Sequence, residues 1–158
     1  MKTLVLGIGN TLLSDEGVGI HVIHALAGVF PPEAGVDLLD GGTLSFTLAG
    51  PIEDADALVV VDAAELKSEP GALRVFEGEA MDAFLVGNRK SSVHEVGLID
   101  LMAIARLTGH WPERRALIAI QPEKLDWGES LTGRVATAVP PACEYIKNLI
   151  GAWHAATR

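Results

Sequence analysis

The sequence has little of what holds small secreted domains or zinc modules together. Cys143 is the only cysteine among 158 residues, so the chain can form neither an intramolecular disulfide nor a thiolate zinc cluster. No apolar run reaches the roughly 20 residues that a membrane-spanning helix needs. The residues behind Met1 lead into a short apolar strand and do not resemble a signal peptide. We therefore expect a cytoplasmic protein.

Basic and aromatic residues are also scarce. Twelve Lys and Arg stand against 21 Asp and Glu, which gives a formal net charge of −9. This balance argues against nucleic acid or an anionic membrane as partner and permits a basic peptide or a cation. Hydrophobic residues make up 49% of the chain but aromatic residues only 5%, so the expected core is aliphatic. The length suits one domain over residues 1–158, and we expect a monomer.

Three well-known catalytic or nucleotide-binding signatures are missing. Leu12 stands where a dinucleotide fingerprint beginning at Gly7 and Gly9 needs its third glycine. The chain contains no GxSxG segment, which makes a serine hydrolase of that type a poor interpretation. Leu98 stands where a zinc signature of the HExxH type beginning at His94 needs its second histidine.

Apolar strands and amphipathic helices alternate along the chain. Unbroken apolar runs predict strands that are buried on both faces, and apolar residues at helical spacing predict the helices. Such an alternation predicts an α/β fold with a mainly parallel, twisted five-stranded sheet and helices on both faces. Cys143 is then expected to be a small core residue of the last helix. The predicted strands cover residues 3–8, 36–39, 57–63, 73–77 and 115–122, and the predicted helices cover 17–29, 44–50, 80–85, 95–107 and 130–153, the last kinked or split at Pro140-Pro141.

Polar side chains follow the predicted strands at the points where they end. Asp15 and Glu16 come after the first strand, Asp40 closes the second, and Asp62 closes the most apolar one. His94 precedes a predicted helix. Open α/β sheets bind their ligands outside the carboxyl ends of the strands. We therefore expect these side chains to gather at one edge of the sheet.

Each of these residues also has a purely structural interpretation. Asp15 could cap the first helix, Asp62 could cap a turn, and His94 could cap a helix or lie on a loop surface. Gly17 and Gly19 fall in the first helical turn, where each costs about 1 kcal/mol relative to alanine. That cost favours a close approach to the backbone at this point.

Glu16, Asp62 and His94 form the candidate site that remains. Oxygen and nitrogen ligands of this kind suit a borderline divalent cation such as nickel, zinc, manganese or iron. An acid–base site without a metal would use the same three residues, and their types alone leave both possibilities open. His21 and His24 lie three residues apart on the first predicted helix, and we expect them to face solvent.

Five segments, taken together, carry a family resemblance. They are GIGNTLLSDEGVG at 7–19, DGGT at 40–43, VVVDA at 59–63, SSVHEVGLIDLM at 91–102 and AIQPEKLDWGESLTGRV at 119–135. In this order they resemble the hydrogenase maturation endopeptidases, which process the large subunit of nickel–iron hydrogenases. The resemblance covers nearly the whole chain, and the first and last segments are specific when they occur together.

The resemblance implies a fold, a reaction and a set of residues. The metal-contacting positions of the family correspond to Glu16, Asp62 and His94, and Asp40 corresponds to a further acidic position beside them. The nickel would belong to the immature large subunit, whose C-terminal extension the endopeptidase removes. The catalytic residues are then expected among Asp62, Asp40 and Glu16, by an aspartic-type or a nickel-assisted mechanism. Gly17 and Gly19 would let the substrate peptide come close.

Two other functions use some of the same residues. A maturation chaperone that holds the immature subunit without cleaving it would need the same nickel contacts. A receiver-like signalling domain would be phosphorylated at Asp62. In that fold, however, the acidic pair follows the first strand directly, whereas Asp15 and Glu16 come several residues later. Gln121 also stands where a receiver carries its lysine, and Lys124 follows Pro122 instead of preceding it.

Overall fold

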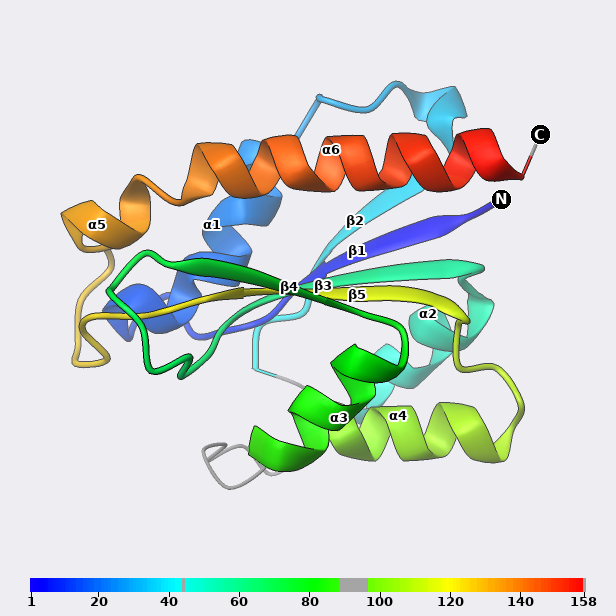
Figure 1. Ribbon diagram of the computed structural model, residues 1–158, viewed down its shortest axis with the longest axis horizontal. Helices are drawn as coiled ribbons and strands as arrows, with labels where there is room; N and C mark the ends of the chain where they lie inside the picture. Colours follow the sequence, from blue (N-terminus) through cyan, green and yellow to red (C-terminus); the bar gives the residue numbers. More distant parts are fainter. Residues whose placement is uncertain (44, 89–96, 158) are drawn as a thin grey trace.

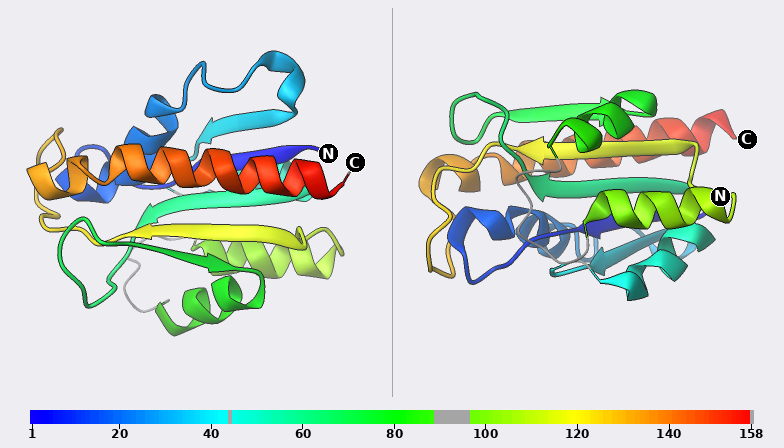
Figure 2. Two further views of the ribbon diagram at one scale, coloured as in Figure 1. Left: turned by 45° about the horizontal axis from the view of Figure 1, so that its top comes forward. Right: turned by 90° about the horizontal axis from the view of Figure 1, so that it is seen from below.

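The molecule is built on one five-stranded sheet (Figure 1). The computed structural model describes residues 1–43, 45–88 and 97–157. The strand order is β2-β1-β3-β5-β4, with parallel pairing from β2 to β5 and an antiparallel edge strand β4. Figure 2 shows β4 and β5 running in opposite directions. The strands are β1 (Thr3–Gly7), β2 (Val36–Asp40), β3 (Ala57–Ala63), β4 (Leu73–Glu77) and β5 (Arg114–Ile120).

Helices cover both faces of this sheet, as Figure 1 shows. One face packs on α1, α5 and α6, and the other packs on α2, α3 and α4. The α-helices are α1 (Val18–Ala25), α2 (Ala49–Asp54), α3 (Glu79–Asn88), α4 (Leu98–Leu107), α5 (Gly133–Ala136) and α6 (Val139–Ala156). Short 3₁₀ turns are η1 (Ser14–Gly17), η2 (Pro32–Ala34) and η3 (Phe46–Leu48).

The apolar runs of the central strands follow from this two-sided cover. Along β3, Val59 faces the layer of α1 and α6, whereas Leu58 and Val60 face the layer of α2 and α4. All three side chains are fully buried. Successive residues of a strand point to opposite faces, so a strand covered on both faces must be apolar at every position.

The predicted α/β fold, with its mainly parallel five-stranded sheet, is confirmed. The boundaries differ in places. The first helix ends at Ala25 rather than at residue 29, and α3 continues to Asn88. The predicted helix start at residue 95 lies outside the described residues.

The last predicted helix is split. The break comes before Pro140-Pro141, which stand in the first turn of α6 rather than inside a continuous helix. Proline is tolerated there because the first helical N–H groups have no partner within the helix.

Cys143 lies in α6 as a half-buried packing residue. Its Sγ is 4.0 Å from the Val22 carbonyl oxygen of α1, and burial raises the pKa of the thiol. Cys143 packs against the core but is only partly buried, so the prediction of a small core residue is confirmed in part. In the described part of the chain, no helix combines the length and the apolar character needed to cross a membrane.

A buried ion pair ties α3 to the sheet and to α4. Asp82 of α3 accepts hydrogen bonds from Arg115 Nε at 2.9 Å and Nη2 at 2.6 Å, and it also binds Arg106 and the Trp111 indole. Burial opposes ionisation of Asp82, but the hydrogen bonds and charges, with Arg115 foremost, outweigh it and hold the pKa of this carboxyl below its usual value.

We expect Asp82→Ala to lower the free energy of unfolding by about 3–5 kcal/mol, because it leaves the buried Arg115 unpaired. Since the pKa is lower in the folded state, the stabilisation is complete above the unfolded-state pKa and is lost as the pH falls through the folded-state value. In urea unfolding from pH 7 to pH 3, the difference in free energy of unfolding between the wild type and the variant should therefore become smaller toward pH 3. Asp54→Ala, at an exposed carboxylate of α2, is the control. A pH-independent difference would contradict this account.

Candidate active site

The carboxyl ends of β1, β2 and β3 are joined by backbone hydrogen bonds. Gly7, the last residue of β1, pairs with Asp40 on one side and with Val61 on the other. Beyond the strand, Ile8 N–H donates to the Val61 carbonyl at 3.0 Å, and Gly9 N–H donates to the Gly42 carbonyl at 2.9 Å. The loops after β1 and β2 thus lie directly beside the strand end that carries Asp62.

Glycines in the first motif allow the chain to pass close to these strand ends. Gly9 has φ +139°, and a Cβ there would lie 2.0 Å from the Glu16 carbonyl oxygen. A Cβ at Gly19 would lie 2.2 Å from the Val61 carbonyl oxygen, and one at Gly17 would lie 2.7 Å from Thr11 Cα. The close approach expected here exists, but the approaching backbone belongs to the same chain. The expectation that Gly17 and Gly19 make room for a substrate peptide is therefore wrong.

Asp62 and Glu16 are electrostatic neighbours at this edge. Burial raises the pKa of Asp62 well above its ordinary value. The Ala63 N–H opposes this shift, and the negative charge of Glu16 adds a smaller increase. Glu16 lies half-buried in η1, which packs against β3. A desolvated carboxyl beside a second carboxylate favours protonation or the binding of a cation.

Asp40 reaches the same edge from β2 and is exposed. Its Oδ1 accepts a hydrogen bond from Gly42 N–H at 2.9 Å, and its Oδ2 lies 3.8 Å from Nε2 of His24. His24 is exposed, as expected, but His21 is half-buried. His21 Nε2 has no hydrogen-bond partner among the described residues, and burial lowers its pKa, as does the neighbouring His24. The expectation that His21 faces solvent is wrong.

The structure brings three of the predicted site residues to one edge of the sheet. Glu16 lies near Asp62 of β3. Asp40 ends β2, which is separated from β3 by β1. His94 lies outside the described residues. Within the ranges that the structure describes, no three His, Cys, Asp or Glu residues are close enough to hold a metal ion. The set of Glu16, Asp62 and His94 therefore stays a prediction.

Asp15 has a role that its sequence context does not reveal. Its carboxylate is fully buried and accepts four hydrogen bonds from the segment after β5. Oδ2 binds the N–H groups of Glu123 and Lys124, both at 2.9 Å, and the hydroxyl of Thr132 at 2.8 Å. Oδ1 binds the Thr132 N–H at 2.8 Å. Burial opposes ionisation, but the backbone donors, led by Lys124, outweigh it and lower the pKa of Asp15.

Asp15 therefore fastens a distant loop. It lies inside η1, and Gly17 holds the N-cap position of α1, so the N-cap interpretation of Asp15 is wrong. Ser14 adds two anchors, from its N–H to the Gly128 carbonyl at 2.7 Å and from its hydroxyl to the Asp126 carbonyl at 2.8 Å. Ser14 adopts φ +51°, which is unusual for a residue with a side chain.

Gln121 organises the loop that follows Asp62. Its side chain is almost fully buried. Its Oε1 accepts a hydrogen bond from the Leu66 N–H at 2.6 Å, and its Nε2 donates to Glu65 Oε2 at 3.0 Å. The role of the Gln121 side chain is structural. The antiparallel edge strand β4 also differs from the all-parallel sheet of receiver-like folds. The receiver interpretation is therefore wrong.

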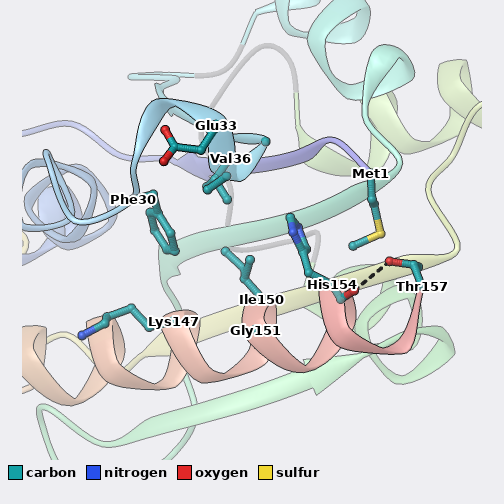
Figure 3. Close-up of a pocket in the computed structure, with 11 residues that line it drawn as sticks. Met1, Phe30, Glu33, Val36, Lys147, Ile150, Gly151, His154 and Thr157 are labelled. Carbon is teal, nitrogen blue, oxygen red and sulfur yellow. Dashed lines mark hydrogen bonds between the residues drawn. The ribbon is translucent and has the colours of Figure 1, made fainter.

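A cavity of about 570 Å³ lies at the opposite end of the molecule, beside the chain termini (Figure 3). It is lined by apolar side chains such as Phe30 and Ile150 and by His154 of α6, whose Nε2 is 2.9 Å from Thr3 Oγ1. None of the predicted site residues lines this cavity, so the acidic sheet edge remains the candidate active site.

Comparison with known proteins decides the family. A model of the hydrogenase maturation protease family matches residues 20–149. The chain is also 35% identical over 147 residues to the hydrogenase 2 maturation protease of Escherichia coli strain K12, covering 92% of this chain and 88% of that protein. The chain belongs to the hydrogenase maturation protease family. The resemblance expected from the five sequence segments is confirmed.

Further relatives of this maturation protease agree. The hydrogenase expression/formation protein HupD of Rhizobium leguminosarum is 37% identical over 153 residues, which cover 96% of this chain and 75% of HupD. Among solved structures, the hydrogenase maturating endopeptidase HybD from Escherichia coli superposes with a TM-score of 0.84 at 34% identity over 92% and 90% of the two chains. A HybD from Thermococcus kodakarensis gives a TM-score of 0.78 at 28% identity, covering 95% and 99% of the chains.

We expect Asp15→Asn to lower the free energy of unfolding by about 2–4 kcal/mol, because an amide nitrogen then faces buried N–H or O–H donors. Asp126→Asn, in the same loop, is the matched control, since the loop contact of Asp126 uses its main-chain carbonyl. Urea unfolding at pH 7 measures both. Equal unfolding midpoints for Asp15→Asn and the wild type would contradict the assigned role.

Proposed function

We propose that this maturation protease removes a C-terminal extension from the immature large subunit of a nickel–iron hydrogenase, and that it recognises nickel already inserted in that substrate. The observation that carries the proposal is the desolvated Asp62 beside the charge of Glu16, at the carboxyl edge of a fold shared with the HybD endopeptidases. The nickel is part of the substrate and not a resident cofactor.

The electrostatics of the sheet edge support a cation as the recognised group. In the free protein, burial and the nearby charge of Glu16 both disfavour the ionised form of Asp62. A divalent cation that docks between the two carboxyls removes the repulsion and offsets the loss of hydration. Carboxylate oxygens together with the imidazole of His94 would form a ligand set suited to nickel.

The proposed chemistry assigns separate tasks to the carboxyls. Nickel in the substrate polarises the scissile carbonyl, while Glu16 and Asp62 hold the metal in position. Binding of the cation favours the ionised form of Asp62. Asp40, exposed and 3.8 Å from His24, takes a proton from the attacking water and returns it to the leaving amine. The products are a new carboxyl terminus and the released peptide.

We expect the wild-type protein to shorten only a nickel-loaded precursor, as seen by intact mass spectrometry of the precursor. Glu16→Gln and Asp62→Asn should each lower kcat/KM by about 100-fold or more, since each removes a charge that faces the metal. Glu33→Gln, at an exposed carboxylate beside the cavity at the other end of the molecule, is the matched control.

The outcomes separate this function from a non-cleaving chaperone. Cleavage by Glu16→Gln at the wild-type rate would overturn the site assignment. Binding of a verified nickel-loaded cognate precursor without any shortening would favour the chaperone. Chelator treatment of the protease alone should leave cleavage unchanged, whereas a precursor prepared without nickel should not be cleaved. Loss of activity on treating the protease would mean a resident metal.

A further inference from the structure

Three large apolar side chains are exposed beside the acidic sheet edge. The exposed fraction is 48% for Leu12, 54% for Leu125 and 76% for Trp127. We call these three residues the apolar shelf. Tryptophan is the residue type most enriched at the energetic centres of protein interfaces, and exposed apolar groups that cluster mark binding surfaces. Nothing in the described fold covers Trp127.

The shelf is formed by two segments that are bonded to each other. Leu13 and Gly128 form a parallel bridge, and the Gly128 N–H donates to the Leu12 carbonyl at 2.9 Å. Leu12 and Trp127 each precede a bridge residue by one position, so the parallel register makes them neighbours. Leu125 follows directly after Lys124, which Asp15 holds through a backbone hydrogen bond.

Hydrogen bonds to Ser14 and Asp15 anchor the loop that carries Leu125 and Trp127. A buried carboxylate at Asp15 and a left-handed conformation at Ser14 both serve to hold residues 123–132. A surface fixed before binding loses little conformational entropy when a partner docks. The fold therefore presents exposed apolar groups on a rigid support, which is the arrangement expected of a recognition surface.

The shelf and the acidic site share one support. Asp15 holds the loop of Trp127, and the next residue, Glu16, lies in η1, which packs against β3, the strand that carries Asp62. In Figure 1 the segment between β5 and α5 lies at the same end of the molecule as the start of α1. A substrate seated on Glu16 and Asp62 would thus extend over the shelf.

The charges around the shelf indicate what kind of segment fits. Within residues 123–129, three exposed carboxylates, Glu123, Asp126 and Glu129, flank Leu125 and Trp127, against one cation, Lys124. The net charge of the whole chain is −9. Apolar contact surrounded by negative charge favours an apolar partner segment that carries basic residues.

We propose that Leu12, Leu125 and Trp127 form a docking surface for an apolar, basic segment of the immature large subunit. The inference rests on the proposed function. The precursor is then held at two points, by its nickel at Glu16 and Asp62 and by this segment on the shelf. The shelf should strengthen the binding of nickel-free and nickel-loaded precursor equally, since it does not contact the metal.

Trp127→Ala and Leu125→Ala test this surface. We expect each to weaken binding of the cognate precursor by about tenfold or more. The Kd should rise by the same factor for nickel-free and nickel-loaded precursor, and kcat should stay within about twofold of wild type because the contact is equally strong in the ground and transition states. Kd is measured by calorimetry, and kcat by mass spectrometry of the products.

Matched controls come from apolar residues exposed elsewhere. Leu107, at the end of α4, is 89% exposed, and Tyr145 of α6 is 40% exposed. Leu107→Ala and Tyr145→Ala should leave Kd unchanged. Glu129→Lys should weaken binding at low salt and lose most of this effect at high salt, because exposed charges are screened. Trp127→Phe should recover most of the affinity lost in Trp127→Ala if apolar contact is what matters.

The results distinguish this inference from the proposed function. An unchanged Kd for Trp127→Ala and Leu125→Ala would overturn the docking surface, even if cleavage proceeds. A lower kcat at unchanged Kd would also overturn it. If the wild type binds the precursor without cleaving it and Trp127→Ala abolishes that binding, the surface stands and the proteolytic function fails. Urea unfolding of each variant excludes a folding defect, which is not expected for side chains this exposed.

Discussion

The candidate site depends on one buried carboxylate. Asp15 is removed from water completely, and an unpaired charge in that position would be too costly for the fold. Four donors from a segment more than a hundred residues away compensate for this burial. The interaction joins the loop after β1 to the loop after β5. It thereby places η1, which also carries Glu16, firmly against the end of β3.

Neighbouring carboxyls in this protein have opposite tasks because their surroundings differ. Asp15 faces only hydrogen-bond donors, so its ionised form is favoured and its pKa is lowered. Asp62 is half-buried at the end of β3; burial raises its pKa, the Ala63 N–H only partly opposes this, and the charge of Glu16 adds to the increase. The first arrangement stabilises the fold, and the second disfavours the ionised form of Asp62. Strongly shifted pKa values of this kind are typical of functional sites.

Close backbone packing gives the sheet edge its shape. Gly9 lies against the Glu16 carbonyl, and Gly19 lies against Ile8 and the Val61 carbonyl of β3, so these glycines allow the turn that carries Glu16 to pack on the strand ends. A side chain at either position would push η1 and α1 away and separate Glu16 from Asp62. The glycines of the first motif thus position the acidic pair through the protein's own backbone. Ser14 and Asp15 of η1 also hold the exposed loop that precedes α5.

The sequence by itself determined the layered fold and the strand ends that carry function. Continuous apolar runs at β1, β3 and β5 required a sheet covered on both faces, and a parallel sheet gathers Glu16, Asp40 and Asp62 at one edge. These inferences succeed because they depend on local patterns and on general rules of chain topology.

Only the tertiary structure decided what Asp15, Gln121 and the motif glycines contact. The partners of Asp15 and Gln121 lie far away in sequence: Asp15 binds the segment 123–132, and Gln121 binds the loop after Asp62. A local pattern cannot distinguish a carboxylate that caps its own helix from one that fastens a distant loop, because both positions follow a strand and precede a helix. The difference arises from how the chain returns to the same place in space, and that is set by packing across the whole sheet.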